Sequence, residues 1–245
     1  MTHPGSTKPP LVVGVTGASG AIYAVRLLQM IVAARRRVSL IVSEHGRRLL
    51  RTEADIGSMA DLRRMVGAEA WDVWVAEYDD GDRGATPASG SAPSSGMVIC
   101  PCSMGTIAAI AAGTSRSLIE RAADVALKER RRLVLVPRET PLSVIHLENM
   151  LRVSRAGAVV LPAAPGFYHR PTRIAQLVDF VVARVLDQLG IPQTVVPPWR
   201  GEAEDGDEAG ERAGDRGGPA LRLGVWREAP GAEEGGGGGL PRRED

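Results

Sequence analysis

Short apolar runs alternate with stretches of helical periodicity along most of this 245-residue chain, and this alternation restricts the fold more than any other feature. Each apolar run has the length of a buried strand, and each periodic stretch repeats apolar residues three and four positions apart. Repeated strand and helix units predict a parallel sheet with helices on both of its faces. The expected fold class is therefore α/β, a single-domain Rossmann-like parallel sheet.

The predicted elements can be given by residue number. Strands are expected at 11–15, 38–42, 97–100, 133–136 and 158–161, with an edge strand at 71–76. Helices are expected at 21–34, 46–53, 59–65, 106–112, 118–129, 142–154 and 172–189. Residues 79–96 are rich in Gly, Ser, Pro and Asp and are expected to form a loop.

The C-terminal end differs in composition from the rest of the chain. Residues 201–245 contain 12 acidic and 6 basic side chains and 13 of the 29 glycines, so they cannot build a core. We expect a flexible segment at 1–10, one domain at 11–200 and a disordered tail at 201–245. The first 200 residues keep 24 basic and 17 acidic side chains, an excess that suits an anionic small molecule. A composition simply biased towards arginine is the alternative explanation.

Several classes of protein are disfavoured by the composition. The only cysteines are Cys100 and Cys102, and two cysteines disfavour a disulfide-stapled module. They also form a poor zinc site, so no metal is expected. A net charge of +1 and 4% aromatic residues do not suggest nucleic-acid binding. No apolar run reaches the length of a membrane helix, and the first residues lack the pattern of a signal peptide. We expect a cytoplasmic protein that does not bind membranes.

Polar residues collect where the predicted strands end, which is where ligands bind to parallel sheets. Gly17 and Gly20 form a tight turn after the first strand, which suits a phosphate or a flavin edge. Ser43 ends the second strand, hydroxyls follow Cys102, and later strand ends carry the residues Arg138, Glu139 and Tyr168. A plain strand-to-helix turn is the alternative reading of the glycines.

Two cations on one predicted helix form a second candidate group. Arg121 and Lys128 are seven residues apart, which is two helical turns along one face, so both side chains can contact one anion. Lys128 is the only lysine after Lys8 in a chain that otherwise uses arginine. A solvated helix face is the usual explanation of such charges, and the spacing alone favours it.

A nicotinamide-dependent oxidoreductase is the first rival, because a glycine turn after the first strand is also typical of that class. Those enzymes need a Tyr-x-x-x-Lys pair, and none of the three tyrosines is followed by lysine at that spacing. The acidic ribose anchor expected after the second strand is replaced by Ser43. The sequence therefore disfavours a dinucleotide-binding enzyme.

Six motifs, in order, resemble the UbiX family of flavin prenyltransferases over about residues 11–199. They are Gly-Ala-Ser-Gly at 17–20, Pro-Ala-Ser-Gly-Ser at 87–91, Cys-Pro-Cys-Ser at 100–103, Leu-Ile-Glu-Arg-Ala-Ala-Asp-Val at 118–125, Val-Pro-Arg-Glu-Thr-Pro-Leu at 136–142 and Pro-Ala-Ala-Pro-Gly-Phe-Tyr at 162–168. The resemblance implies a flavodoxin-like flavoprotein that joins the dimethylallyl group of dimethylallyl monophosphate to N5 and C6 of reduced FMN. It also implies a metal-independent reaction, a UbiD-type decarboxylase as recipient of the prenylated FMN, and a homo-oligomer, expected to be a dodecamer with sites between subunits.

The resemblance also assigns residues to the site. Contacts to FMN are implied for residues at the strand ends, namely Gly17, Ala18, Ser19, Ser43, Ser103, Met104, Gly105, Thr106 and Arg138. Contacts to the substrate phosphate are implied for Ser89, Gly90, Arg121, Lys128, Tyr168 and Arg184. The catalytic residues implied are Glu139 for proton transfer, Glu53 and Ser19 in support, Lys128, and Trp199 over the prenyl group. Pairing of Glu139 with Arg138 is the alternative for that carboxylate.

Two other functions remain open on the sequence. An FMN-dependent cysteine decarboxylase of the same fold would carry an Asn-containing loop where Pro-Ala-Ser-Gly-Ser stands, and a histidine near the first helix, where residues 23–29 have none. An FMN-binding regulatory subunit would keep the turn but would not need Glu139, Lys128 and Tyr168 together. The pathway served, quinone synthesis or aromatic-acid breakdown, is also open.

Overall fold

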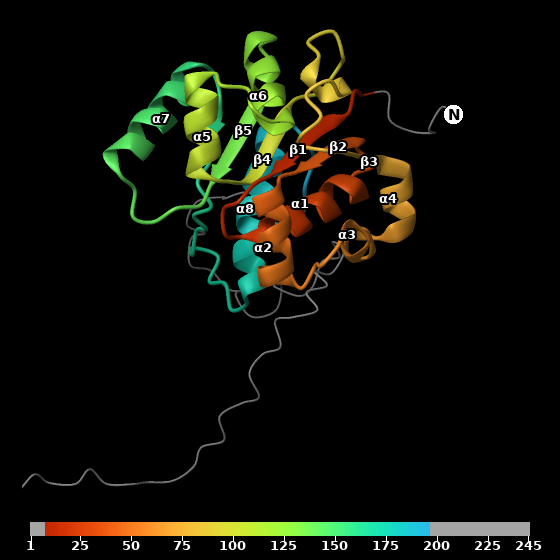
Figure 1. Ribbon diagram of the computed structural model, residues 1–245. Coiled ribbons are helices and arrows are strands. Elements are labelled where there is room, and N and C mark those ends of the chain that lie inside the picture. Colours follow the sequence, from red (N-terminus) through yellow and green to blue (C-terminus); the bar gives the residue numbers. More distant parts are fainter. Residues whose placement is uncertain (1–7, 197–245) are drawn as a thin grey trace, which may run out of the picture.

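The computed structural model describes residues 8–196 of the chain. Trp199 and the tail at 201–245 lie outside the described residues, as does most of the N-terminal segment. Between residues 8 and 196 the chain folds as the predicted α/β structure, with a six-stranded sheet between helices (Figure 1). None of the helices in this range is long and apolar enough to cross a membrane.

All six strands are parallel and lie in the order β3-β2-β1-β4-β5-β6. The direction of the connections reverses between β1 and β4, which makes that pair the switch point where ligands bind to sheets of this kind. The strands are β1 Leu11–Val15, β2 Val38–Val42, β3 Val75–Tyr78, β4 Met97–Cys102, β5 Leu133–Pro137 and β6 Val159–Val160.

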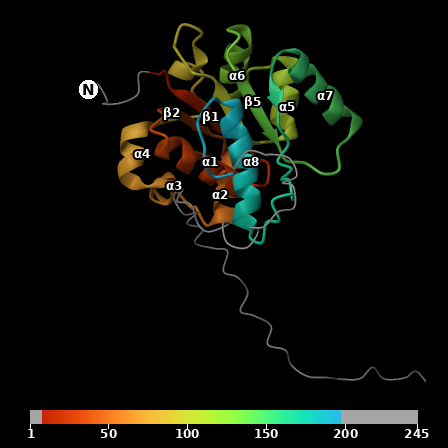
Figure 2. The ribbon, with the colours of Figure 1, turned by 180° about the vertical axis from the view of Figure 1, so that it is seen from behind.

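Helices cover both faces of the sheet. Figure 2 shows α8 and α1 together on one face, which α2, α3 and α4 extend, while α5, α6 and α7 cover the other face. The helices are α1 Ala21–Ala33, α2 Glu44–Ala54, α3 Met59–Val66, α4 Ala68–Trp74, α5 Met104–Ala112, α6 Leu118–Lys128, α7 Val144–Arg155 and α8 Ile174–Gln188, with a 3-10 turn η1 at Thr86–Ala88.

Successive strand residues enter different halves of the core, because side chains alternate between the faces of a strand. In β1, Val13 packs in the cluster with α1 and α8, whereas Val12 packs in the cluster with α5 and α6. Val134 and Leu135 divide in the same way in β5. Both faces of the sheet are therefore apolar and covered, as the alternation in the sequence predicts.

An ion pair joins the first and last helices within this core. The Nε of Arg26 in α1 donates to Oδ1 of Asp179 in α8 at 2.6 Å, and Nη2 donates to Oδ2 at 3.3 Å. The side chain of Arg26 is only 4% exposed, and that of Asp179 is 19% exposed. A charge removed from water to this extent depends on its counterion.

The structure differs from the sequence prediction mainly around Trp71. Residues 71–74 belong to α4, and the predicted edge strand begins only at Val75. Trp71 is 3% exposed and packs in the core with α1 and α3, so tertiary packing places it on a helix. Helices α2 and α5 begin two residues earlier than predicted, because Ser43 and Ser103 cap them.

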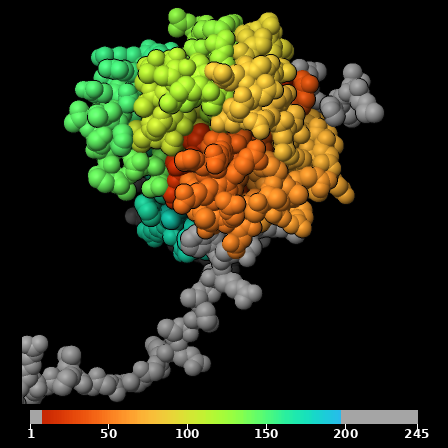
Figure 3. Space-filling model, in the orientation of Figure 1, coloured from red at the N-terminus to blue at the C-terminus, as the bar shows by residue number. Residues whose placement is uncertain are grey.

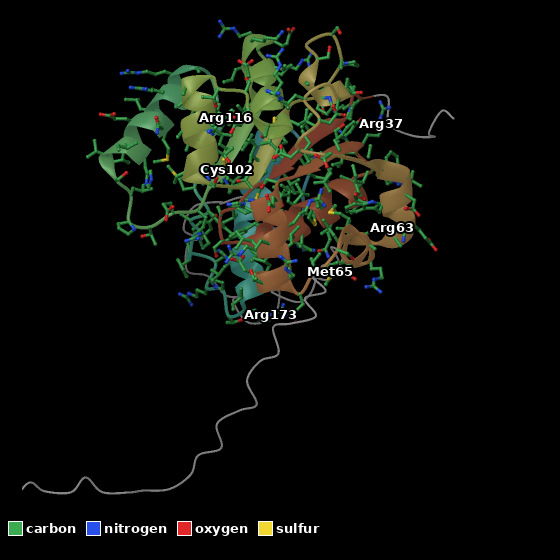
Figure 4. All side chains as sticks on the ribbon, in the orientation of Figure 1. Arg37, Arg63, Met65, Cys102, Arg116 and Arg173 are labelled. Carbon is green, nitrogen blue, oxygen red and sulfur yellow. The ribbon has the colours of Figure 1, made fainter. Side chains whose placement is uncertain are left out.

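Because the strands are parallel, the sheet has a carboxyl edge, where all strands end, and an amino edge, where all strands begin. Figure 4 labels Cys102 at the carboxyl edge, as the last residue of β4, and Arg37 at the amino edge, just before β2. The five residues of β5 separate the two edges by about 16 Å.

Candidate active site

The turn between β1 and α1 is held in place by close packing against α2. A Cβ on Gly17 would lie 2.6 Å from the Cβ of His45, and a Cβ on Gly46 would lie 2.6 Å from the carbonyl oxygen of Val15. Gly20 has φ +113°, a backbone conformation that favours glycine. The glycines therefore allow the first turn of α2 to lie directly against the end of β1.

Glu53 of α2 caps helix α1. Its Oε2 accepts hydrogen bonds from the backbone N–H groups of Gly20 at 2.8 Å and Ala21 at 2.9 Å. A carboxylate at a helix N-terminus satisfies unpaired donors and interacts favourably with the helix dipole. A ligand phosphate at this turn would have to displace Glu53, so of the two ligands suggested by the sequence the geometry favours a flavin edge.

We expect Glu53→Ala to destabilise the fold by about 1 kcal/mol, the usual effect of losing a helix cap. The measurement is the free energy of unfolding in urea. Glu77→Ala, on the exposed face of β3, is the matched control and should leave stability unchanged. Equal stability of the two variants would show that Glu53 does not hold the turn.

Thr16 ties β1 to β4 at the switch point. Its hydroxyl donates to the carbonyl oxygen of Pro101 at 3.1 Å and accepts from the backbone N–H of Ser103 at 2.8 Å. The Oγ of Ser103 lies 2.9 Å from Oγ1 of Thr106 and caps α5 by accepting from the backbone N–H of that residue. Thr16 is 3% exposed and was not selected from the sequence, although a hydroxyl residue directly after the first predicted strand was visible there.

Arg138 connects the end of β5 to the same turn. Its Nε donates to the carbonyl oxygen of Ser19 at 3.1 Å. The exposed side chain of Glu139 accepts from the backbone N–H of Thr140 at 3.1 Å, and no ion pair joins it to Arg138. The structure thus brings together at the carboxyl edge the predicted residues Gly17, Ala18, Ser19, Ser43, Glu53, Ser103, Met104, Gly105, Thr106, Arg138 and Glu139.

Part of this carboxyl-edge group reaches the surface on one face of the molecule. In Figure 3 the red residues near the N-terminal end of the described chain are visible between the yellow-green α5 and the orange α2. The first turns of these two helices, capped by Ser103 and Ser43, border the opening. Their hydroxyls and backbone N–H groups can bind an anionic or hydrogen-bonding ligand there.

Ser89, Gly90 and Lys128 form a second group, at the amino edge. A Cβ on Gly90 would lie 2.5 Å from Nζ of Lys128, and the carbonyl oxygen of Gly90 accepts from Nη2 of Arg131 at 2.6 Å. The residues that follow, Arg131 and Arg132, lead directly into β5. Within one chain, these three predicted phosphate ligands therefore lie at the opposite edge of the sheet from Ser19 and Arg138.

Arg121, Tyr168 and Arg184 complete the predicted phosphate ligands and come from separate elements of the chain. The ring of Tyr168 contacts the ring of Phe180 edge-on, with centroids 5.7 Å apart. Arg184 lies one turn after Phe180 and lines an open cavity of about 350 Å³ between β6 and α8. Arg121 lies on α6, on the other face of the sheet.

Each cation among these predicted ligands is paired with a carboxylate of its own helix or of the next residue. Arg121 pairs with Asp124 at 2.7 Å, Arg184 with Asp187 at 2.9 Å, and Lys128 with Glu129. Lys128 lowers the pKa of the Glu129 carboxyl, chiefly through their hydrogen bond. Exposed pairs of this kind contribute little to stability, so a phosphate can replace the carboxylates at small cost.

The two cysteines are unsuited to thiolate chemistry. Burial raises the pKa of the Cys100 thiol to about 12, and it raises the pKa of the Cys102 thiol further. Both side chains lie inside β4 and are fully buried. Among residues 8–196, no cluster of three or more His, Cys, Asp or Glu side chains is placed to hold a metal ion.

Comparison with known proteins identifies the family. The Flavoprotein family model matches residues 2–186. The chain is 52% identical over 196 residues to the flavin prenyltransferase UbiX of Pseudomonas aeruginosa, a match that covers 77% of this chain and 93% of that protein. The chain belongs to the UbiX family of flavin prenyltransferases. The recognition from sequence motifs is thereby confirmed, and this UbiX family member is a flavoprotein and an enzyme.

Two solved UbiX-type structures share the fold. AnUbiX in complex with FMN and dimethylallyl pyrophosphate is 40% identical with a TM-score of 0.73, covering 79% of this chain and 98% of that one. A dodecameric FMN-dependent UbiX-like decarboxylase from Escherichia coli O157:H7 is 41% identical with a TM-score of 0.70, covering 78% and 99%. The α/β fold predicted for this UbiX family member is therefore confirmed by both the model and its structural relatives.

Proposed function

We propose that this chain joins the dimethylallyl group of dimethylallyl monophosphate to N5 and C6 of reduced FMN. The observation that carries the proposal is that Ser19, Ser103 and Arg138 lie together at the switch point of the sheet. The chain that forms this sheet is related to UbiX enzymes. Reduced FMN supplies the nucleophilic N5 and C6 when it is bound. An FMN-dependent cysteine decarboxylase is the weaker candidate, since the family relationship favours prenyl transfer.

The carboxyl-edge group would bind and orient FMN. Ser103 and Thr106 present hydroxyls at the N-terminus of α5, where a phosphate is also favoured by the helix dipole. Ser19 and Arg138, held together by their hydrogen bond, would lie along the flavin ring. The exposed carboxylate of Glu139, which is not engaged by Arg138, is available to move a proton at the flavin and the prenyl group.

The second part of the proposal concerns the leaving phosphate. Ser89, Gly90, Arg121, Lys128, Tyr168 and Arg184 are proposed to bind it, because cations and hydroxyls stabilise the charge that develops on a departing phosphate. Ser89, Gly90 and Lys128 lie at the amino edge, and the turn between β1 and α1 in the same chain lies at the carboxyl edge. The length of β5, about 16 Å, separates the two edges. We therefore propose that each site is completed by a second copy of the chain in a homo-oligomer, and that the oligomer is a dodecamer.

A mixing experiment tests the shared site. Arg138→Ala removes a residue of the carboxyl edge and Lys128→Ala a residue of the amino edge, so each variant alone should be nearly inactive. Assemblies formed by co-expressing the two should regain part of the wild-type activity, since some sites combine two intact halves. Arg138→Ala mixed with Ser103→Ala, which shares its edge, is the control that should stay inactive. Failure of the first mixture to regain activity would contradict a site shared between copies.

We propose that the reaction needs no metal ion. Three cations among the proposed phosphate ligands can supply the positive charge that a metal would otherwise provide. Activity should therefore persist unchanged in excess EDTA, measured against a sample supplemented with magnesium. Loss in EDTA with recovery on adding magnesium would contradict this part of the mechanism.

We further propose that residues 11–200 form the catalytic domain, that Trp199 shields the prenyl group, and that a UbiD-type decarboxylase uses the product. The experiment that tests the function itself is mass analysis of the flavin after anaerobic incubation with reduced FMN and dimethylallyl monophosphate. We expect the flavin mass to rise by one five-carbon prenyl unit. Unchanged flavin would overturn the proposed function, and the same assay on a chain ended after Arg200 tests the domain boundary.

A further inference from the structure

A short loop segment, residues 89–94, carries two of the proposed phosphate ligands, Ser89 and Gly90. Figure 1 shows the loop that contains it, in yellow, beside α6, against which the 3-10 turn η1 packs. Ala88, at the end of η1, is 8% exposed, and beyond the segment the backbone N–H of Ser95 donates to the carbonyl oxygen of the residue before β1 at 3.0 Å. The segment is therefore fixed at both ends, and between them it contains neither helix nor strand.

The side chain of Arg131 holds the middle of this segment. Its Nη2 donates to the carbonyl oxygen of Gly90 at 2.6 Å, and its Nη1 donates to the carbonyl oxygen of Ala92 at 2.9 Å and to Oγ of Ser94 at 3.3 Å. Within residues 8–196, no other group donates a hydrogen bond to either carbonyl. One guanidinium thus joins three positions of the loop, a task that suits its planar fork of donors.

Arg131 is itself held by the way in which α6 ends. Arg130 has φ +55°, and the backbone N–H of Arg131 donates to the carbonyl oxygen of Ala126 at 2.8 Å, which is a usual helix ending. Strand β5 begins two residues later, at Leu133. Lys128, the last residue of α6, therefore belongs to the same rigid piece of backbone as Arg131.

The loop segment lies directly against Lys128. A Cβ on Gly90 would lie 2.5 Å from Nζ of Lys128, and the Oγ atoms of Ser89 and Ser91 lie 2.9 Å apart. Lys128 is paired with a carboxylate, whereas Arg131 forms no ion pair within residues 8–196. The hydrogen bonds of Arg131 therefore go to the loop, and they keep the loop beside the ammonium group.

We propose that Arg131 is a positioning residue for the leaving phosphate. It holds Ser89 and Gly90 where, together with Lys128, they bind the phosphate of the prenyl donor, and it does so without touching the substrate. This inference deepens the proposed function and rests on it. Arg131 is placed to act through the loop because both of its Nη atoms already donate to loop oxygens.

The test is the steady-state kinetics of Arg131→Met, which keeps much of the length of the side chain and removes its donors. We expect the KM for dimethylallyl monophosphate to rise roughly tenfold while kcat falls less than about threefold, because the loop supplies binding but no reacting group. Affinity for FMN, which depends on the carboxyl edge, should not change. Arg132→Met is the matched control and should keep the wild-type KM, since that exposed side chain donates to Gln188 instead. A folded Arg131→Met variant with the wild-type KM would overturn the inference.

Double variants separate positioning of the loop from a general effect on the protein. In a Ser89→Ala background, Arg131→Met should raise KM no more than about threefold, because part of what Arg131 positions is already missing. In an Arg184→Ala background, where the altered phosphate ligand belongs to another element, Arg131→Met should keep its full effect. The full effect in both backgrounds would refute action through the loop.

Circular dichroism checks that each variant is folded. If Arg131→Met does not fold, Arg131→Lys decides the question, because it keeps the charge and loses the fork, and an unchanged KM would again overturn the inference. Calorimetric titration of the FMN-loaded protein with dimethylallyl monophosphate separates this inference from the proposed function. Roughly tenfold weaker binding by the variant, with no prenylation by the wild type, would refute the proposed function alone. Equal binding by the two proteins, or none by the wild type, would overturn the role of Arg131.

Discussion

Glu139→Gln is expected to retain FMN and to lose about 10²–10⁴-fold of its turnover, the usual contribution of a positioned proton-transfer group. The amide keeps the size of the side chain and can still accept from the backbone N–H of Thr140, so the loop should keep its conformation. What it removes is a carboxylate that is exposed at the carboxyl edge and is not paired with Arg138.

The measurement is the rate of prenylated flavin formation at saturating substrates, with FMN affinity determined separately by fluorescence titration. Glu69→Gln, at an exposed position of α4, is the control and should behave as wild type. A glutamine variant with near-normal turnover would assign Glu139 a structural role. Loss of FMN binding together with turnover would instead point to a role in holding the flavin.

Asp179→Asn is expected to cause the largest loss of stability, about 3 kcal/mol, because the buried guanidinium of Arg26 loses its carboxylate counterion. In a domain of this size that corresponds to a fall in melting temperature of roughly 6–12 °C. The asparagine has nearly the shape of aspartate, so the change isolates the charge. Thermal unfolding followed by circular dichroism gives the measurement.

Asp72→Asn is the matched control for this loss. Arg63 and Asp72 also form an ion pair, but their side chains are 38% and 56% exposed, so solvent already screens both charges. We expect no measurable change in melting temperature. A similar small effect at both positions would mean that burial of the Arg26–Asp179 pair does not strengthen the dependence on the carboxylate.

The order and type of the elements could be predicted from the sequence because the strands are buried on both faces. Runs such as residues 133–136 are short and apolar throughout, whereas the helices repeat apolar residues three and four positions apart over longer stretches. The stretch around Trp71 was assigned wrongly, since a short apolar run fits a strand or a buried helix equally well. Only contact with α1 and α3 decides between them.

The candidate site was predictable only in part, for a physical reason. Strand ends place Ser19, Ser103 and Arg138 together in any sheet of this topology, so local sequence was enough to choose them. The capping of α1 by Glu53 joins residues 33 positions apart through side-chain geometry, which spacing does not encode. The spacing of Arg121 and Lys128 does not show where Lys128 lies, but the predicted order of elements does, because Lys128 ends the helix that precedes β5.

The deep burial of Cys100 and Cys102 has a practical consequence for studying the assembly. With the Cys100 pKa raised to about 12, and the Cys102 pKa higher still, almost none of either thiol is ionised at neutral pH, and alkylating reagents attack the thiolate. The folded native chain should therefore be nearly inert to maleimide dyes. A single cysteine introduced on the surface would then accept a fluorophore selectively, which permits energy-transfer measurements between neighbouring copies without first replacing the natural cysteines.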